Sequence, residues 1–200
     1  MVKETWNSRY DTEKFIYGFN PNNFLKSYIE NNPPAKILLP GDGEGRNAIY
    51  AAKKGWDVTA YDYSESAKKK ALILAKENNV QINYLNSNVE TFSSKDKFDL
   101  ISIIYLHLSP SIRHTFHLGL SKYLNPNGKI LLECFSKLQF ANKSGGPKNM
   151  DLLYSLKDIQ SDFKNYNIEL LEQKEIELNE GLLHQGKASV IRLIASKSIL

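Results

Sequence analysis

The chain has 200 residues, the length of one ordinary domain, and 42% of them are hydrophobic. This composition excludes a disordered or collagen-like chain, and no apolar run is long enough to predict a membrane span. Lys and Arg exceed Asp and Glu by only 26 to 22, far from the focused basic stripe typical of nucleic-acid binding. The single cysteine, Cys134, cannot form an internal disulfide, and the first residues show no signal-peptide pattern. We therefore expect a soluble, cytoplasmic protein.

Short hydrophobic runs alternate with helical patterns from Lys36 onward, which predicts βαβ units around a parallel sheet. We expect strands at 36–39, 57–61, 82–85, 98–104 and 129–134, and helices at 47–54, 64–77, 110–123 and 156–163. The stretch Asn125-Pro126-Asn127-Gly128 predicts a turn before the fifth strand. Two antiparallel strands, 168–178 and 188–195, follow. The pattern predicts an α/β, Rossmann-like three-layer sandwich: a seven-stranded, mostly parallel sheet with an antiparallel C-terminal strand.

The most informative motif is the junction after the first strand, where glycines occupy the alternate positions Gly41, Gly43 and Gly45. They allow the backbone to turn sharply and approach a ligand. A helix is expected to follow, and the free N–H groups at its N-terminus, at Arg46 and Asn47, would face the same ligand. Asp62 stands at the end of the second strand, where a carboxylate can accept hydrogen bonds from both ribose hydroxyls. Loop and carboxylate together predict a nucleoside cofactor. The third glycine of a dinucleotide fingerprint is absent.

Residues 37–45 resemble the first motif of the class I S-adenosylmethionine-dependent methyltransferases, and Asp62 matches their ribose-binding acidic residue. The stretches Gly45-Arg46-Asn47-Ala48 and Gly181-Leu182-Leu183-His184 are similar to the tellurite-resistance (TehB-like) group of small-molecule methyltransferases. The resemblance implies S-adenosyl-L-methionine as cofactor, S-adenosyl-L-homocysteine as product, and a small-molecule acceptor such as a thiol or chalcogen oxyanion.

Two positions depart from that pattern. Leu39 stands where the family usually has an acidic residue, and Gln185 where the tellurite-type enzymes have arginine. We expect Asp42 or Glu44 to take over part of the work of the missing carboxylate, which would help to hold the methionine end of the cofactor.

Further cofactor contacts are expected just after the parallel strands, because ligands of open α/β sheets bind beyond the strands' carboxyl ends. Asn88 and Val89 occupy the place where the family contacts adenine, Tyr63 could pack on the same base, and Ile104 lies where the methionine moiety is expected.

The aromatic N-terminal segment, with Tyr10 and Tyr17, has the composition of a lid over cofactor and acceptor, although packing of a helix onto the sheet would explain it too. We expect one methyltransferase domain over 1–200, with a helical lid at 1–32, a cofactor-binding half at 36–135 and a substrate-side half at 136–200.

A sulfonium methyl group is already activated, so catalysis of its in-line displacement can consist largely of positioning. A hydroxyl or amine acceptor must also lose a proton, and His107 and His184 are the candidate bases. Tyr105 follows the fourth strand near the expected reacting centre, and Arg192 could attract an anionic acceptor. Each histidine could instead be structural, and Arg192 could simply form an ion pair.

His114 and His117 are three residues apart on a predicted helix, but no cysteine or carboxylate joins them at useful spacing, so we expect no metal site. The run 68–70 of three lysines is interpreted as a solvated helix face. We expect a monomer or homodimer without a membrane or nucleic-acid partner. Two alternatives stay open: a methyltransferase acting on RNA or protein, and a non-catalytic S-adenosylmethionine-binding protein.

Overall fold

The computed structural model describes residues 3–197 and divides into two compact units. Among the described residues, the first unit contains 3–92 and 180–182, and the second contains 93–179 and 183–197. Three strands of the seven-stranded sheet belong to the first unit and four to the second. The predicted fold class is confirmed: the sheet is mostly parallel and carries antiparallel strands from the C-terminal part of the chain.

In the first unit the strands lie in the order β3-β2-β1, and all are parallel. Ile37 pairs with Val58, and Ala60 pairs with Tyr84. The middle of β1 is apolar and almost completely buried, as expected for a central parallel strand. The elements of this unit are α1 (Lys3–Tyr10), α2 (Asn23–Glu30), β1 (Lys36–Pro40), α3 (Arg46–Lys53), β2 (Asp57–Asp62), α4 (Glu65–Glu77) and β3 (Asn83–Asn86).

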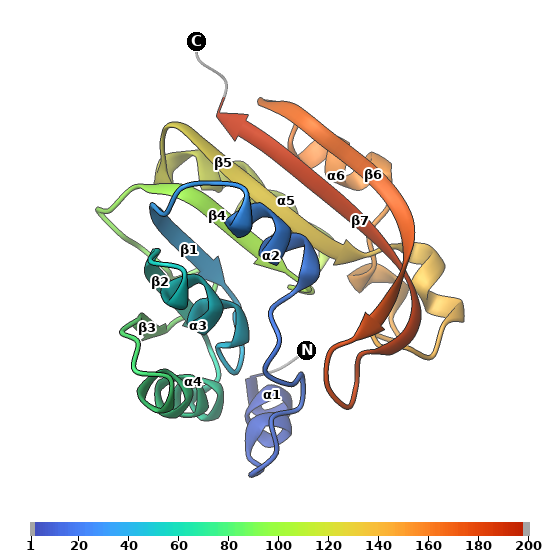
Figure 1. Cartoon of the computed structure of the whole chain (residues 1–200). Helices are drawn as coiled ribbons and strands as arrows, with labels where there is room; N and C mark the ends of the chain where they lie inside the picture. Colours follow the sequence, from blue (N-terminus) through green and yellow to red (C-terminus); the bar gives the residue numbers. More distant parts are fainter. Residues whose placement is uncertain (1–2, 198–200) are drawn as a thin grey trace. The chain divides into compact units, whose positions relative to one another are not determined.

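In the second unit the order is β4-β5-β7-β6; β4 and β5 are parallel, and β7 is antiparallel to both β5 and β6. Figure 1 shows β6 and β7, orange and red, as one long antiparallel pair beside β5. The elements are β4 (Phe98–Ile104), α5 (Pro110–Gly119), η1 (Leu120–Tyr123), β5 (Leu124–Phe135), η2 (Lys137–Ala141), η3 (Met150–Leu152), α6 (Leu156–Asp162), β6 (Tyr166–Asn179) and β7 (Gln185–Lys197).

Local sequence signals explain several boundaries. The Ser64 side chain accepts a hydrogen bond from the Ala67 N–H and caps α4 as predicted. Ser155 and Asp158 form a capping box at the start of α6. None of the helices in residues 3–197 is long and apolar enough to cross a membrane.

The predicted turn before the fifth strand is placed differently by the structure, because β5 already begins at Leu124. Phe98 pairs with Leu124 and Leu100 with Lys129, so the intervening residues of β5 form an irregularity within the ladder. Asn127 there has φ of 66°, the left-handed conformation that the Asn-Gly pattern favours. The turn residues therefore interrupt a strand instead of preceding one.

Candidate active site

The glycine-rich loop between β1 and α3 adopts the conformation that its sequence requires. Gly41, Gly43 and Gly45 have φ values of 64°, 58° and 88°, a region that residues with side chains rarely adopt. The Gly41 N–H donates to the Tyr61 carbonyl at 2.7 Å, and the Tyr84 hydroxyl donates to the Gly43 carbonyl at 2.5 Å. The loop is thus fixed to its neighbouring strands.

The Asp62 carboxylate lies directly against this loop. It accepts hydrogen bonds from the Gly43 N–H at 3.2 Å and the Ser64 N–H at 2.9 Å, and only 6% of the residue is exposed. Burial raises the pKa of Asp62 to about 6 and outweighs the opposite effect of the backbone hydrogen bonds. A carboxylate held in this way has lone pairs left to accept further hydroxyl donors.

Asp42 is a second carboxylate of the loop. Its Oδ2 accepts the Ala48 N–H at 3.2 Å, which satisfies one of the free donors of the α3 N-terminus. Burial raises the pKa of Asp42 to about 7. Asp42 thus braces the loop against α3, part of the work expected in place of the acidic residue absent at Leu39.

Glu44 has a different role from the one expected. Its Oε2 accepts the N–H groups of Ile16 (2.8 Å) and Tyr17 (3.3 Å), and its Oε1 lies 2.5 Å from Lys70 Nζ. Glu44 therefore ties the N-terminal segment to the glycine loop. Lys70 is only 8% exposed, so the interpretation of 68–70 as a wholly solvated face is wrong at this position. Helical spacing could not reveal this, because the partner that keeps Lys70 buried comes from another element.

The N-terminal segment covers the loop and the start of α4. A Cβ atom added to Gly43 would lie 2.7 Å from the Tyr10 hydroxyl, so Tyr10 packs directly on the loop. The Asn7 side-chain oxygen accepts from Ser64 Oγ at 2.7 Å and from the Glu65 N–H at 3.0 Å. The Tyr17 hydroxyl accepts from Arg9 at 3.2 Å. The arrangement provides the contacts that a cover over the loop needs.

The side chains of Arg46 and Asn47 bind protein groups. Arg46 Nη2 lies 2.8 Å from Glu180 Oε2, and both side chains are less than a tenth exposed. Asn47 Oδ1 accepts the Asn22 N–H at 2.9 Å, and Asn22 Nδ2 donates to Glu180 at 3.3 Å. These two predicted cofactor residues thus attach the N-terminal segment and the turn after β6 to α3.

Tyr63, Asn88 and Val89 follow β2 and β3 and are all partly exposed. The Asn88 side-chain oxygen already accepts the N–H groups of Glu90 (2.8 Å) and Thr91 (2.9 Å). The amino group of adenine needs a hydrogen-bond acceptor, but the Asn88 side-chain oxygen already accepts hydrogen bonds within the turn that follows β3. The assignment of the Asn88 side chain to adenine therefore stays a prediction.

In the second unit, three predicted catalytic residues gather around Phe135, at the ends of β4 and β5. The Phe135 ring stacks on Tyr105 with 4.5 Å between centroids and on His107 with 5.8 Å, and the His184 ring meets it edge-on at 5.4 Å. His184 also meets Tyr105 edge-on at 5.0 Å. We call Tyr105, His107, Phe135 and His184 the aromatic cluster. Ile104, predicted to lie near the methionine moiety, is the last residue of β4.

The remaining catalytic candidate, Arg192, is paired with a residue that the sequence did not reveal. Arg192 Nε lies 2.5 Å from Glu133 Oε2, and the Tyr105 hydroxyl donates to Glu133 Oε1 at 2.7 Å. Glu133 is completely buried. Tyr105 has φ of 50°, which is strained for a tyrosine, and its backbone N–H donates to the Glu133 carbonyl. Arg192 thus forms an ion pair, as the alternative interpretation expected. Glu133 binds both the hydroxyl and the backbone N–H of Tyr105.

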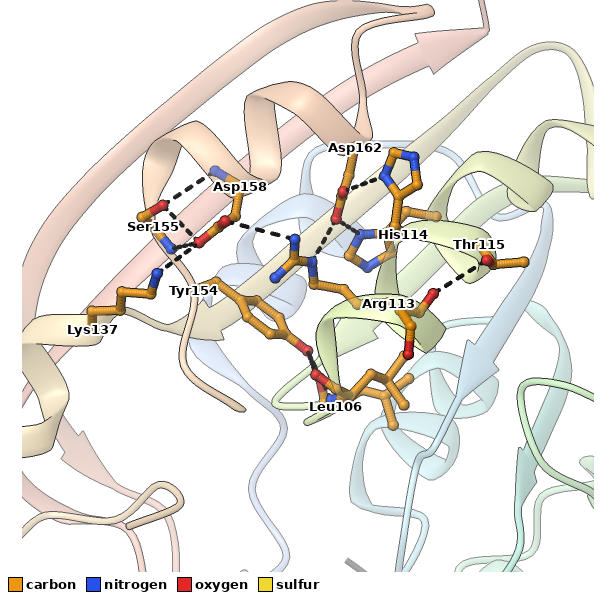
Figure 2. A network of polar contacts seen from close by, with 12 residues as sticks. Leu106, Arg113, His114, Thr115, Lys137, Tyr154, Ser155, Asp158 and Asp162 are labelled. Atoms are coloured by element: carbon orange, nitrogen blue, oxygen red, sulfur yellow. Dashed lines mark hydrogen bonds and ion pairs between the residues drawn. The ribbon is translucent and has the colours of Figure 1, made fainter. Parts of the chain in front are cut away.

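His114 and His117 share a carboxylate after all, contrary to the expectation from spacing. Their Nδ1 atoms lie 2.8 and 2.9 Å from the two oxygens of Asp162, which comes from α6 (Figure 2). Burial lowers the pKa of His117, although Asp162 opposes the effect. In residues 3–197 no group of three or more His, Cys, Asp or Glu side chains is arranged to hold a metal ion. The cluster joins α5 to α6.

The sheet order defines a Rossmann-like fold that carries a glycine loop and a buried aspartate, and solved methyltransferase structures have the same fold. More particularly, residues 37–128 match the family described as "Methyltransferase domain". The match extends from β1 to within β5 and includes the glycine loop and Asp62.

Curated relatives match half of the chain or more. The chain is 34% identical over 110 residues to a "Ubiquinone biosynthesis O-methyltransferase" of Rickettsia akari, covering 55% of this chain and 44% of the relative. A protein of the same name from Rickettsia bellii is 29% identical over 168 residues, covering 78% of this chain and 70% of the relative. The chain thus spans about half the length of several of these relatives.

Solved structures share the fold over almost the whole chain. TehB from Haemophilus influenzae has a TM-score of 0.73 at 16% identity, covering 98% of this chain and 67% of TehB. Magnesium protoporphyrin IX methyltransferase from Synechocystis PCC 6803, solved with bound S-adenosylhomocysteine, has a TM-score of 0.73 at 18% identity and covers 98% of both chains. These similarities confirm the fold that the sequence resemblance implied.

Proposed function

We propose that this chain transfers the methyl group of S-adenosylmethionine to a small-molecule acceptor. The observation that carries the proposal is the buried Asp62 carboxylate bonded to the Gly43 N–H of a loop with three left-handed glycines. A ribose needs such a carboxylate, and a close-fitting ligand needs such a loop. The family match over 37–128 and the names of the relatives support the same chemistry.

Residues of the first unit are assigned to the cofactor. Asp62 would accept the ribose hydroxyls, the loop backbone would contact the methionine part, and Tyr10 and Tyr17 would belong to the cover. We propose residues 1–200 as one methyltransferase domain, with 1–32 as the cover, 36–135 as the cofactor-binding half and 136–200 as the substrate side. The cofactor supplies an activated methyl group when bound, so the chain has only to orient the acceptor and, where needed, take its proton.

The aromatic cluster of the second unit is assigned to the acceptor side. It contains two histidines, and a hydroxyl acceptor must lose a proton that histidine can take near neutral pH. The relatives' printed name, an O-methyltransferase, favours an oxygen acceptor over the thiol or chalcogen oxyanion implied by the tellurite-type resemblance. We therefore propose methylation of a small hydroxyl compound, with His107 or His184 as the base.

Two measurements test this proposal. Calorimetry with S-adenosylhomocysteine should give micromolar binding for the wild type, and Asp62→Ala should abolish it with an unchanged circular dichroism spectrum. Radiolabelled methyl transfer should then be followed to catechol, dithiothreitol and selenite. Transfer to catechol supports an oxygen acceptor, and transfer to dithiothreitol or selenite alone would replace it with a thiol or chalcogen acceptor. If S-adenosylhomocysteine binds but no methyl group is transferred to any of the three compounds, to RNA or to protein, a non-catalytic binding protein would be favoured.

A further inference from the structure

One buried hydroxyl holds the backbone on both sides of His107. The Tyr154 hydroxyl donates to the Leu106 carbonyl at 3.0 Å and accepts the Leu108 N–H at 2.9 Å (Figure 2). Tyr154 is 1% exposed, so neither bond has to compete with bulk water. Because Leu106 and Leu108 flank His107, this hydroxyl brackets the candidate base.

The backbone of Tyr154 is hydrogen-bonded to Phe135, the residue on which the His107 ring stacks. The Tyr154 N–H donates to the Phe135 carbonyl at 3.1 Å, and the Lys137 N–H donates to the Tyr154 carbonyl at 2.9 Å. Phe135 is the residue on which the rings of His107 and Tyr105 stack. A single residue thus fixes both the histidine's loop and the ring beneath the histidine.

The Tyr154 ring is itself supported by a buried ionic group. The Arg113 guanidinium carbon lies 5.0 Å from the centre of the ring, and Arg113 Nε lies 2.7 Å from Asp162 Oδ2. Arg113 is 7% exposed and Asp162 1%. Figure 2 shows this group from Asp162 through Arg113 to Tyr154 and Leu106. The support is rigid because its charges are paired and buried.

We propose that Tyr154 is a positioning residue of the acceptor side, whose hydroxyl holds His107 against Phe135 in the orientation needed to take the acceptor's proton. The proposal rests on the proposed function. Displacing a reacting group by about 1 Å can cost up to about a hundredfold in rate, so a small movement of this loop has a measurable consequence.

The test removes one oxygen atom. Tyr154→Phe keeps the ring and its packing on Arg113 but loses both hydrogen bonds to the loop. Tyr166→Phe is the matched control, because Tyr166 is also buried and its hydroxyl donates to a backbone carbonyl of α5, that of His117, at 3.1 Å. Three properties are compared: the imidazole resonances and NMR titration of His107, calorimetric binding of S-adenosylhomocysteine, and kcat and KM for catechol with their pH profile.

Tyr154→Phe should shift the His107 imidazole resonances and its titration, lower kcat/KM for catechol by about ten- to a hundredfold with a displaced pH profile, and leave cofactor binding unchanged. Tyr166→Phe should change none of these. A Tyr154→Phe variant that matches the control in both the His107 titration and kcat/KM would overturn the proposal. If the wild type does not methylate catechol, the oxygen-acceptor function fails, whereas the His107 titration still decides whether Tyr154 positions the histidine.

Discussion

The buried Glu44–Lys70 pair predicts that one carboxylate makes a large contribution to holding the N-terminal cover. Glu44→Ala removes the partner of Lys70 Nζ, which lies 2.5 Å away, and the acceptor of the Ile16 and Tyr17 N–H groups. The side chains of Lys70 and Glu44 are 10% and 3% exposed, so the ammonium group left behind is poorly solvated.

Removing one partner of a buried pair costs about 3–5 kcal/mol, and each buried N–H left without an acceptor adds about 1–3 kcal/mol. The N-terminal segment can detach and return these groups to water, which limits the total loss. We therefore expect the free energy of unfolding of Glu44→Ala to fall by about 3 kcal/mol. The N-terminal segment should also become sensitive to protease.

Urea unfolding followed by circular dichroism measures the loss in Glu44→Ala, and the same measurement is made on Lys70→Met and on the double variant Glu44→Gln/Lys70→Met. The double variant should be far less destabilised than Glu44→Ala, because neither buried charge is then left alone. A loss below about 1 kcal/mol in Glu44→Ala, together with undiminished protease protection of residues 3–22, would refute the reasoning.

Three further outcomes follow from the same structure. The pKa of Asp62 is raised to about 6 and the ribose needs the ionised form, so affinity for S-adenosylhomocysteine should fall about tenfold per pH unit below 6; calorimetry from pH 5 to 8 tests this, and a flat profile contradicts it. The pKa of Asp42 is raised from 3.8 to about 7 in the folded protein, so its contribution to stability is complete below pH 3.8 and lost as the pH rises through 7. Asp42→Asn should therefore stabilise the ligand-free protein by about 4 kcal/mol at pH 8 and have little effect at pH 4, as urea titrations at both pH values would reveal. Burial and the nearby Glu133 raise the pKa of the Cys134 thiol, so a thiol reagent should label it only on unfolding; fast labelling of the native protein would show that the β5 core opens.

The sequence determined the scaffold and the cofactor loop because those features depend on local properties of the chain. Runs of apolar residues predict buried parallel strands whatever their partners are. Gly41, Gly43 and Gly45 adopt left-handed backbone angles that glycine favours. Asp62 ends β2, and the direction of a parallel strand is enough to place its carboxylate beside the loop. These predictions needed no knowledge of distant contacts.

The tertiary structure alone decided which charged and polar residues are buried, because each is paired with a residue far away in the sequence. Arg46 meets Glu180 across 134 positions, and Tyr154 brackets His107 from more than forty residues away. The sequence predicted Lys70 to be one of three solvated lysines, but it pairs with Glu44. The spacing of His114 and His117 did not predict their shared partner Asp162. A charge can be buried only where the fold brings an opposite charge or a hydrogen-bond partner to it. The periodicity of apolar residues along the sequence does not identify that partner.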